Sequence, residues 1–176
     1  GTVSMTGQVA QNGILTAHNT LADPDGLGVI GYQWESLANG AWTTLSAANT
    51  LTLTQAEVGK QIRLVAGYRD GWGAEESVAT AATAAVININ DRPTGEVKIS
   101  GTGVAAGSLW TAQQTLADAD GLGTVQYQWQ VSADGSTDPW TTVANANTFT
   151  LRSVDVGKRL RVVASYTDGQ GTAESV

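Results

Sequence analysis

The chain has 176 residues, a formal net charge of −7 and no cysteine. Nine Lys and Arg against sixteen Asp and Glu provide no basic face for nucleic acid or for anionic lipids, so we expect neither as a partner. The lack of cysteine excludes a disulfide scaffold, and no apolar run is long enough for direct membrane insertion.

One sequence occurs twice along the chain. The stretch Thr-Leu-Ala-Asp-Pro-Asp-Gly-Leu-Gly at residues 20–28 returns at 115–123 with Ala in place of Pro, an offset of 95 residues (115 − 20). Both copies lead into Tyr-Gln-Trp, at 32–34 and 127–129. Each copy is long enough to fold alone. The sequence therefore predicts two domains, residues 1–90 and 95–176, joined by a short linker at 91–94.

Turn signals divide the first copy into short segments with alternating apolar residues. The turns contain Pro and Gly in the stretch 20–28, Asn39-Gly40 and Asp70-Gly71. Residues 54–60 form a corner between sheets. The strands predicted between these turns cover residues 1–8, 14 onward, 29–37, 41–45, 51–53, 61–68 and 76–89. Short strands at this spacing are typical of an immunoglobulin-like β-sandwich, in which Trp34 and Trp129 would occupy the two cores.

The second copy follows the same order, with a three-residue insertion in the hairpin around residues 133–135. The second copy stops at Val176, which is equivalent to Val78 of the first copy, and has no counterpart of residues 79–90. The predicted fold is therefore all-β, with two tandem immunoglobulin-like β-sandwich domains of about seven strands each, the second lacking its last strand. We expect an edge there that is exposed or filled by a neighbouring molecule.

Four motifs recur in the same order in both copies: Thr-Leu-Ala-Asp-x-Asp-Gly-Leu-Gly, Tyr-Gln-Trp, Asp/Glu-Val-Gly-Lys and Tyr-x-Asp-Gly-x-Gly-x-x-Glu-Ser-Val. Together they resemble the tandem immunoglobulin-like repeats of giant bacterial surface adhesins of the RTX type. The link at residues 88–93 looks like the Asn-Asp-x-Pro junction of those repeats and of cadherin-like domains. The resemblance covers nearly the whole chain. It implies a secreted, extracellular spacer at the bacterial cell surface, stiffened by calcium, with a role in adhesion and biofilm and with neighbouring repeats as partners.

Acidic residues of the second copy are expected to meet at one end of its sandwich. In an immunoglobulin-like domain the N-terminus lies at the same end as the loops after the second and sixth strands. This places Asn90 and Asp91 beside the turns that carry Asp118, Asp120 and Asp168. Calcium binds six to eight oxygens and would remove the repulsion between these carboxylates. The sequence thus predicts a Ca²⁺ site there.

The prediction extends to the first domain, in weaker form for the aspartates of the first copy, and one alternative stays open. Glu57 is a candidate bridge to the calcium site from the first domain. Asp23, Asp25 and Asp70 repeat half of the site without a preceding link, so we expect them to bind calcium weakly or not at all. Alternatively, all these aspartates belong to ordinary Asp-Gly turns and cap local amides.

The inventory of reactive side chains argues against an enzyme. His18 is the only histidine, and the chain has neither cysteine nor a Gly-x-Ser-x-Gly elbow. A binding module for carbohydrate or a surface receptor is the alternative function, because Trp72 lies in a turn where the second copy has Gln170. A third interpretation is an accessory module of a secreted enzyme. Tyr68 and Tyr166 are expected to bond to the backbone at strand ends.

Overall fold

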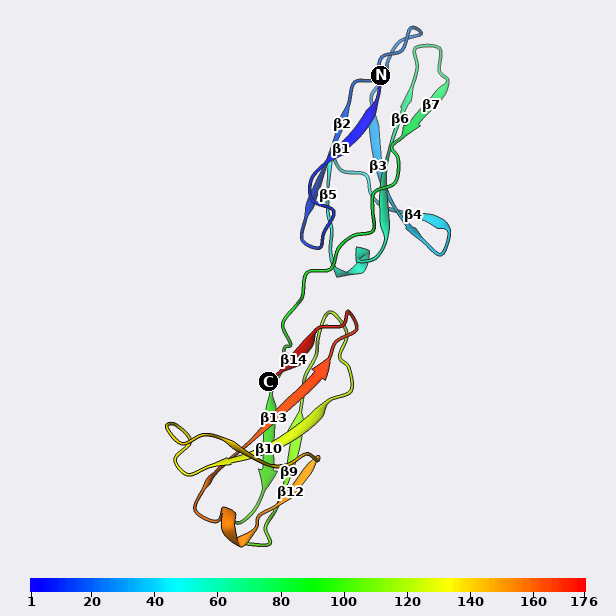
Figure 1. Ribbon diagram of the computed structural model, residues 1–176. Coiled ribbons are helices and arrows are strands. Elements are labelled where there is room, and N and C mark those ends of the chain that lie inside the picture. Colours follow the sequence, from blue (N-terminus) through cyan, green and yellow to red (C-terminus); the bar gives the residue numbers. More distant parts are fainter. The chain divides into compact units, whose positions relative to one another are not determined.

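The computed structural model describes residues 1–176, which form two compact units, unit 1 (Gly1–Ile89) and unit 2 (Asn90–Val176) (Figure 1). Every regular element apart from two short 3₁₀ turns is a β-strand. No helix is long and apolar enough to span a bilayer. The predicted all-β fold is confirmed.

Unit 1 is a sandwich of two antiparallel sheets. Its three-stranded sheet has the order β1-β2-β5, and its four-stranded sheet has the order β4-β3-β6-β7. The turn η1 (Gln55–Glu57) occupies the predicted corner. The strands are β1 (Val3–Thr6), β2 (Ile14–Asn19), β3 (Gly31–Ala38), β4 (Ala41–Ser46), β5 (Thr50–Thr52), β6 (Gln61–Arg69) and β7 (Glu75–Ala79).

Unit 2 repeats this arrangement, with the sheet orders β12-β9-β8 and β11-β10-β13-β14. Its corner carries η2 (Ser153–Asp155). The strands are β8 (Val97–Gly101), β9 (Leu109–Gln114), β10 (Gln126–Ser132), β11 (Thr141–Ala144), β12 (Thr148–Thr150), β13 (Arg159–Thr167) and β14 (Ala173–Ser175). The repeated sequence therefore encodes the same sandwich twice.

A tryptophan on the third strand anchors each core, as predicted. Trp34 and Trp129 are both 0% exposed. Their indole Nε1 atoms donate to the backbone carbonyls of Ala48 and Ala146, each at 2.9 Å. The hydrogen bond satisfies the one polar atom of a ring that is otherwise surrounded by apolar side chains.

The closing segment of unit 1 is less regular than the predicted strand 76–89. β7 ends at Ala79, and beyond it Thr80 and Thr83 use their side-chain oxygens to accept from the backbone N–H groups of Leu64 and Ile62. The backbone N–H groups of both threonines still donate to the carbonyls of Leu64 and Ile62, at 2.9 Å each, so the side-chain oxygens replace only the backbone acceptors of a regular ladder. Unit 2 does contain a last strand, β14, so the strand we expected to be missing is present up to Ser175. The irregular segment 80–89 is what has no counterpart within residues 95–176.

Candidate metal centre

The first aspartate of each acidic turn is held inside its own unit by hydrogen bonds. Asp118 accepts from the backbone N–H of Asp120 at 2.9 Å through Oδ1 and from the hydroxyl of Tyr166 at 2.5 Å through Oδ2. In unit 1, Asp23 likewise accepts from the hydroxyl of Tyr68 at 2.8 Å. The expectation that these tyrosines bond to the backbone was wrong, because a carboxylate is the stronger acceptor and lies within reach.

Both tyrosine hydroxyls remain protonated at any ordinary pH. Burial, followed by the hydrogen bond to Asp118, holds the pKa of Tyr166 far above its usual value. For Tyr68 the hydrogen bond to Asp23 comes first among the causes that raise the pKa. Each hydroxyl is thus a fixed donor that fastens the acidic turn to the strand carrying the tyrosine.

Glycines allow the two acidic turns of unit 2 to approach each other closely. The N–H of Gly169 donates to the carbonyl of Gly121 at 3.0 Å. A Cβ atom on Gly169 would lie 2.5 Å from the carbonyl oxygen of Asp120, and one on Gly123 would lie 1.9 Å from that of Thr167. The repeated glycines are therefore required by the contact between turns, which joins the loop of Asp120 to the loop of Asp168.

Two carboxylate oxygens at this contact are buried and have no hydrogen-bond partner. Asp168 uses Oδ1 to accept from the backbone N–H groups of Gln170 and Thr172, at 2.9 and 2.7 Å, and leaves Oδ2 without a partner. Asp120 accepts from the N–H of Asp91 at 2.7 Å through Oδ2 and leaves Oδ1 without a partner. These residues are only 6% and 4% exposed. Turn capping thus accounts for Oδ1 of Asp168 and the link residue Asp91 for Oδ2 of Asp120, while the other oxygen of each carboxylate is left without a partner.

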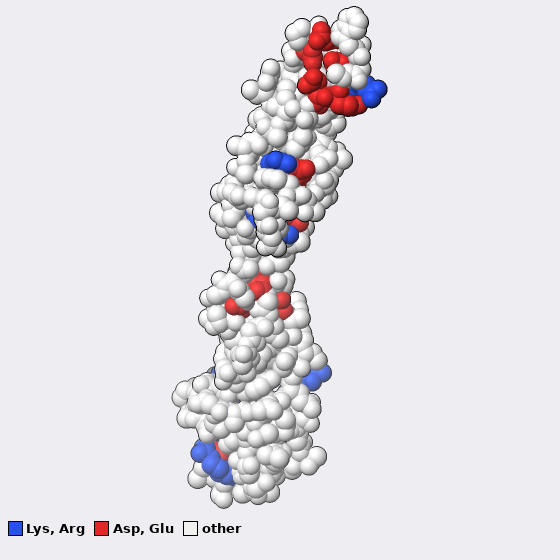
Figure 2. All heavy atoms as spheres, turned by 90° about the vertical axis from the view of Figure 1, so that its right-hand side faces the viewer, with Lys and Arg blue, Asp and Glu red and all other residues white.

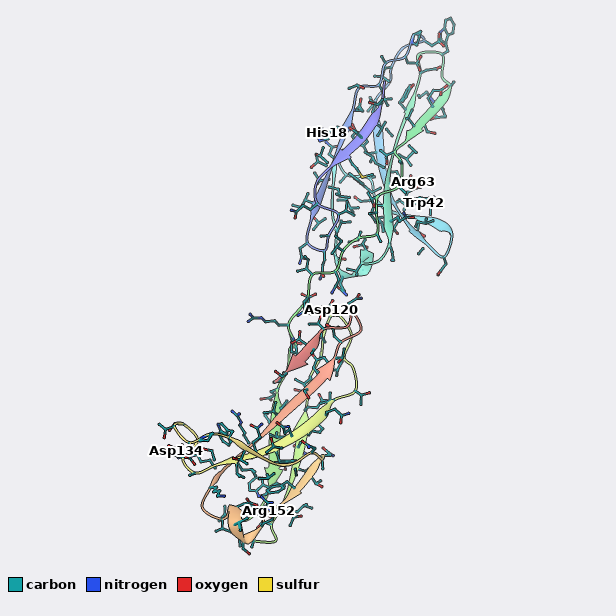
Figure 3. The ribbon with its side chains drawn as sticks, in the orientation of Figure 1. His18, Trp42, Arg63, Asp120, Asp134 and Arg152 are labelled. Carbon is teal, nitrogen blue, oxygen red and sulfur yellow. The ribbon has the colours of Figure 1, made fainter.

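The link residues at the start of unit 2 are bound to the same end of the sandwich. The N–H of Asp91 reaches Asp120, and Nδ2 of Asn90 donates to Oε1 of Glu174 at 2.7 Å. Figure 3 shows Asp120 at this end of unit 2. The sequence reasoning missed Glu174, although its repetition at Glu76 within the Glu-Ser-Val motif was an available signal.

The candidate residues of unit 1 are held differently. Asp70 has the same local bonds as Asp168, accepting from the N–H groups of Trp72 and Ala74 at 2.9 and 2.7 Å. Asp25 is exposed. Neither residue leaves a buried oxygen without a partner. Figure 2 shows acidic side chains gathered at one end of unit 1, on a surface that is mostly uncharged.

Glu57 has a structural role within unit 1. Its Oε2 atom accepts from both the N–H and the hydroxyl of Thr54, at 2.9 and 2.7 Å, and forms the capping box of η1. In unit 2 the equivalent Asp155 binds Arg152, which holds the pKa of that carboxyl below its usual value. A bridge from Glu57 to a metal stays a prediction.

The chemistry of the site in unit 2 fits a hard cation. Carboxylate and backbone oxygens are the ligands of calcium, and an unpaired buried carboxylate costs several kcal/mol that a cation would offset. Side chains alone do not complete the site, because no group of three or more His, Cys, Asp or Glu has the spacing of a metal centre. Asp120 and Asp168 would hold the ion through their unpartnered oxygens, with Asn90, Asp91 and backbone carbonyls as further candidate ligands, whereas Asp118 already uses both oxygens in hydrogen bonds within unit 2.

The fold is that of two immunoglobulin-like sandwiches in series. Comparison with known proteins does not identify a family for this chain. No family model and no curated protein matches the chain. One similar structure is a tetra-tandem repeat in the extending region of a large adhesion protein. It has 20% identity and a TM-score of 0.28, and the match covers 99% of this chain and 47% of that one. Another consists of the chicken CNTN1 FN1–FN3 domains, with 11% identity, a TM-score of 0.31 and coverage of 98% and 65%. The chain thus spans about half the length of the first. Such identities and scores establish no relationship of function.

Proposed function

We propose that this chain is a spacer segment of a large bacterial cell-surface adhesin, and that calcium bound at the start of unit 2 stiffens the link between its two domains. The resemblance of the repeated motifs to RTX-type adhesin repeats supports the spacer role. The pair of buried, unpartnered oxygens on Asp120 and Asp168 is the observation that carries the calcium proposal.

The ion would restrain the link residues Asn90 and Asp91, whose conformation the protein must otherwise fix without a metal. Asn90 and Asp91 already form hydrogen bonds to Glu174 and Asp120. A cation shared among Asp91, Asp120 and Asp168 would fasten the link to both acidic turns and remove the cost of the two orphaned oxygens. The link would then leave unit 2 in a fixed direction, which a spacer requires.

Small-angle X-ray scattering in millimolar calcium and in chelator tests the proposal. We expect a narrower distribution of interatomic distances and a better-defined maximum dimension in calcium. Asp168→Asn keeps the Oδ1 acceptor of its turn and replaces the orphaned oxygen with an amide, so it should scatter identically in both buffers. The matched control, Asp70→Asn in unit 1, should respond like the unmodified chain. Scattering that calcium leaves unchanged refutes the stiffening role.

A second candidate function rests on Trp72. This side chain is 85% exposed at the tip of a turn, and a flat exposed indole is a suitable surface for stacking on a sugar ring. Binding to a glycan array that disappears in Trp72→Ala would support recognition of glycan or of a glycosylated receptor. If the chain binds no glycan, the spacer role is the only proposed function that remains. We infer no catalytic role, since the chain has a single histidine and no cysteine.

A further inference from the structure

Each unit carries an arginine stacked on a tryptophan on the outer face of its four-stranded sheet. In unit 1 the guanidinium of Arg63 lies 4.2 Å from the ring centre of Trp42 (Figure 3). In unit 2 the guanidinium of Arg161 lies 4.2 Å from the ring centre of Trp140. Both arginines alternate along their strands with side chains that pack into the core. The stacking fixes the plane of each guanidinium and therefore the direction of its N–H groups.

A buried carboxylate balances the arginine of unit 1. Nε of Arg63 donates to Oε2 of Glu35 at 2.6 Å, and Glu35 is only 8% exposed. The other oxygen of Glu35 accepts from Nε2 of Gln33 at 2.7 Å, and the same Nε2 donates to the hydroxyl of Thr44 at 3.0 Å. This network is closed, because the positive charge has a partner and both amide N–H groups have acceptors.

Glutamine replaces that carboxylate in unit 2. Gln130 faces Arg161 across the ladder, at the register position that Glu35 has in unit 1. Nε of Arg161 donates to Oε1 of Gln130 at 2.8 Å. Arg161 forms no ion pair, whereas Arg63 and Arg152 each have a carboxylate partner. The charge of Arg161, which is an exposed residue, is therefore uncompensated.

The same replacement sets the direction of the neighbouring hydrogen bonds. A guanidinium can only donate, so the amide oxygen of Gln130 must face Arg161 and its Nε2 must face Gln128. Nε2 of Gln130 accordingly donates to Oε1 of Gln128 at 2.6 Å. Nε2 of Gln128 and the terminal nitrogens of Arg161 then have no acceptor within the protein. We call these groups the donor site of unit 2; a site made only of donors is the arrangement that an oxyanion requires.

The donor site lies away from the segment that closes the sandwich in unit 1. There, residues 80–86 bond to the backbone of β6 along the edge opposite β3. Arg161 instead bonds to Gln130 on β10 and stacks on Trp140 beside β11. Every group of the donor site comes from residues 128–161, so its geometry does not depend on how the edge of β13 is closed.

We propose that the donor site of unit 2 binds the carboxylate of an acidic saccharide, such as a uronic acid. The terminal nitrogens of Arg161 present parallel N–H groups that match a planar carboxylate. Thr142 is exposed and faces Gln130 across the ladder, so its hydroxyl and the amide of Gln128 are available to the hydroxyl groups of the sugar. The proposal depends neither on the calcium site nor on Trp72.

The charge of the protein favours a saccharide over nucleic acid at this site. Duplex DNA carries one negative charge per about 1.7 Å of its axis, and a protein with a net charge of −7 repels so dense a polyanion. A polyuronate carries one charge per sugar ring, and a short oligomer brings only a few. An acidic peptide also carries carboxylates, and the experiment separates it from the saccharide.

Titration of the chain with trigalacturonate, followed in ¹H–¹⁵N NMR spectra, tests this proposal. Chelator is present, because calcium would otherwise bind the ligand. We expect saturable shifts of the Arg161 Nε–H, the Gln128 side-chain amide and the Trp140 indole N–H, and weaker binding as salt is added. Maltotriose, a neutral trisaccharide, should cause no shift. Trp72→Ala should bind trigalacturonate like the unmodified chain, and loss of binding in this variant would refute the assignment to unit 2.

Two substitutions exchange the networks of the two units. Gln130→Glu supplies the carboxylate that unit 1 already has, so the unfolding midpoint should be retained while affinity falls by at least about tenfold. Glu35→Gln is the reverse change and should create a second site, detected at the Nε–H of Arg63. The proposal is refuted if the unmodified chain shows no shift, if Gln130→Glu binds unchanged, or if Glu35→Gln gains no binding. A triglutamate peptide that binds as tightly as trigalacturonate would refute recognition of a saccharide.

Discussion

Calcium is expected to raise the unfolding temperature of unit 2 selectively. Extracellular calcium modules bind with dissociation constants of about 10⁻⁴ to 10⁻³ M. At about 10 mM calcium, binding to the folded state alone contributes about 1.4 to 2.7 kcal/mol. Unit 2 falls in the class of about 60–100 residues, for which 1 kcal/mol shifts the midpoint by about 4–8 °C. The expected rise is therefore about 6–20 °C.

Differential scanning calorimetry in calcium and in chelator measures this shift. Asp168→Asn preserves both turn hydrogen bonds through its amide oxygen, so the variant should fold and lose the calcium response. Asp70→Asn, at the equivalent position of unit 1, should retain it. Magnesium and sodium chloride at equal ionic strength control for general screening of the net charge of −7. A full shift in Asp168→Asn, or equal shifts in both units, would show that the orphaned oxygens bind no ion.

Three further substitutions test the fold on which the site depends. Trp129→Phe removes a buried hydrogen bond and part of a buried ring, and should lower the stability of unit 2 alone by about 1–3 kcal/mol in denaturant titration; an equal loss in both units would contradict two separate cores. Asp155 has a pKa depressed by Arg152, so its stabilisation is present at neutral pH and is lost as pH falls below about 4. Acid unfolding of Asp155→Asn should accordingly be less steep than that of the unmodified chain, and parallel curves would oppose this origin. Gly123→Ala places a Cβ atom against the carbonyl of Thr167 and should destabilise unit 2 by about 3 kcal/mol in the same titration; an unchanged midpoint would show that the turns can separate.

The regularities that the sequence predicted are those with a local cause. Alternation of apolar residues places side chains on one face of a strand, and so it identified the strands and the buried Trp34 and Trp129. Glycine and aspartate pairs mark turns by their backbone preferences. Prediction was least accurate after Ala79, where Thr80 and Thr83 keep their backbone N–H donors on β6 but accept through their side-chain oxygens. These hydrogen bonds depend on β6 lying beside the segment after Ala79. A local sequence pattern carries no information about that neighbour.

The acidic site shows the same division between local and distant causes. The repeated aspartates were visible in the sequence, and the general layout of an immunoglobulin-like domain predicted that they lie at one end of the sandwich. The sequence did not show which oxygen of each carboxylate accepts a hydrogen bond and which has no partner. Asp118 is occupied by Tyr166, whereas Asp120 and Asp168 each retain an unpartnered oxygen. The corresponding aspartates of unit 1 leave no buried oxygen without a partner, and Asp25, the equivalent of Asp120, is exposed there.

The sequence by itself determined that one sandwich is encoded twice, where its turns lie, and which tryptophan each core surrounds. Tertiary structure alone decided which carboxylate oxygens are orphaned and how the segment after Ala79 closes unit 1. The physical reason is that hydrogen bonding and burial depend on atoms brought together from segments far apart in the chain. Periodicity along the chain reports only which face a side chain occupies, and never what lies opposite it.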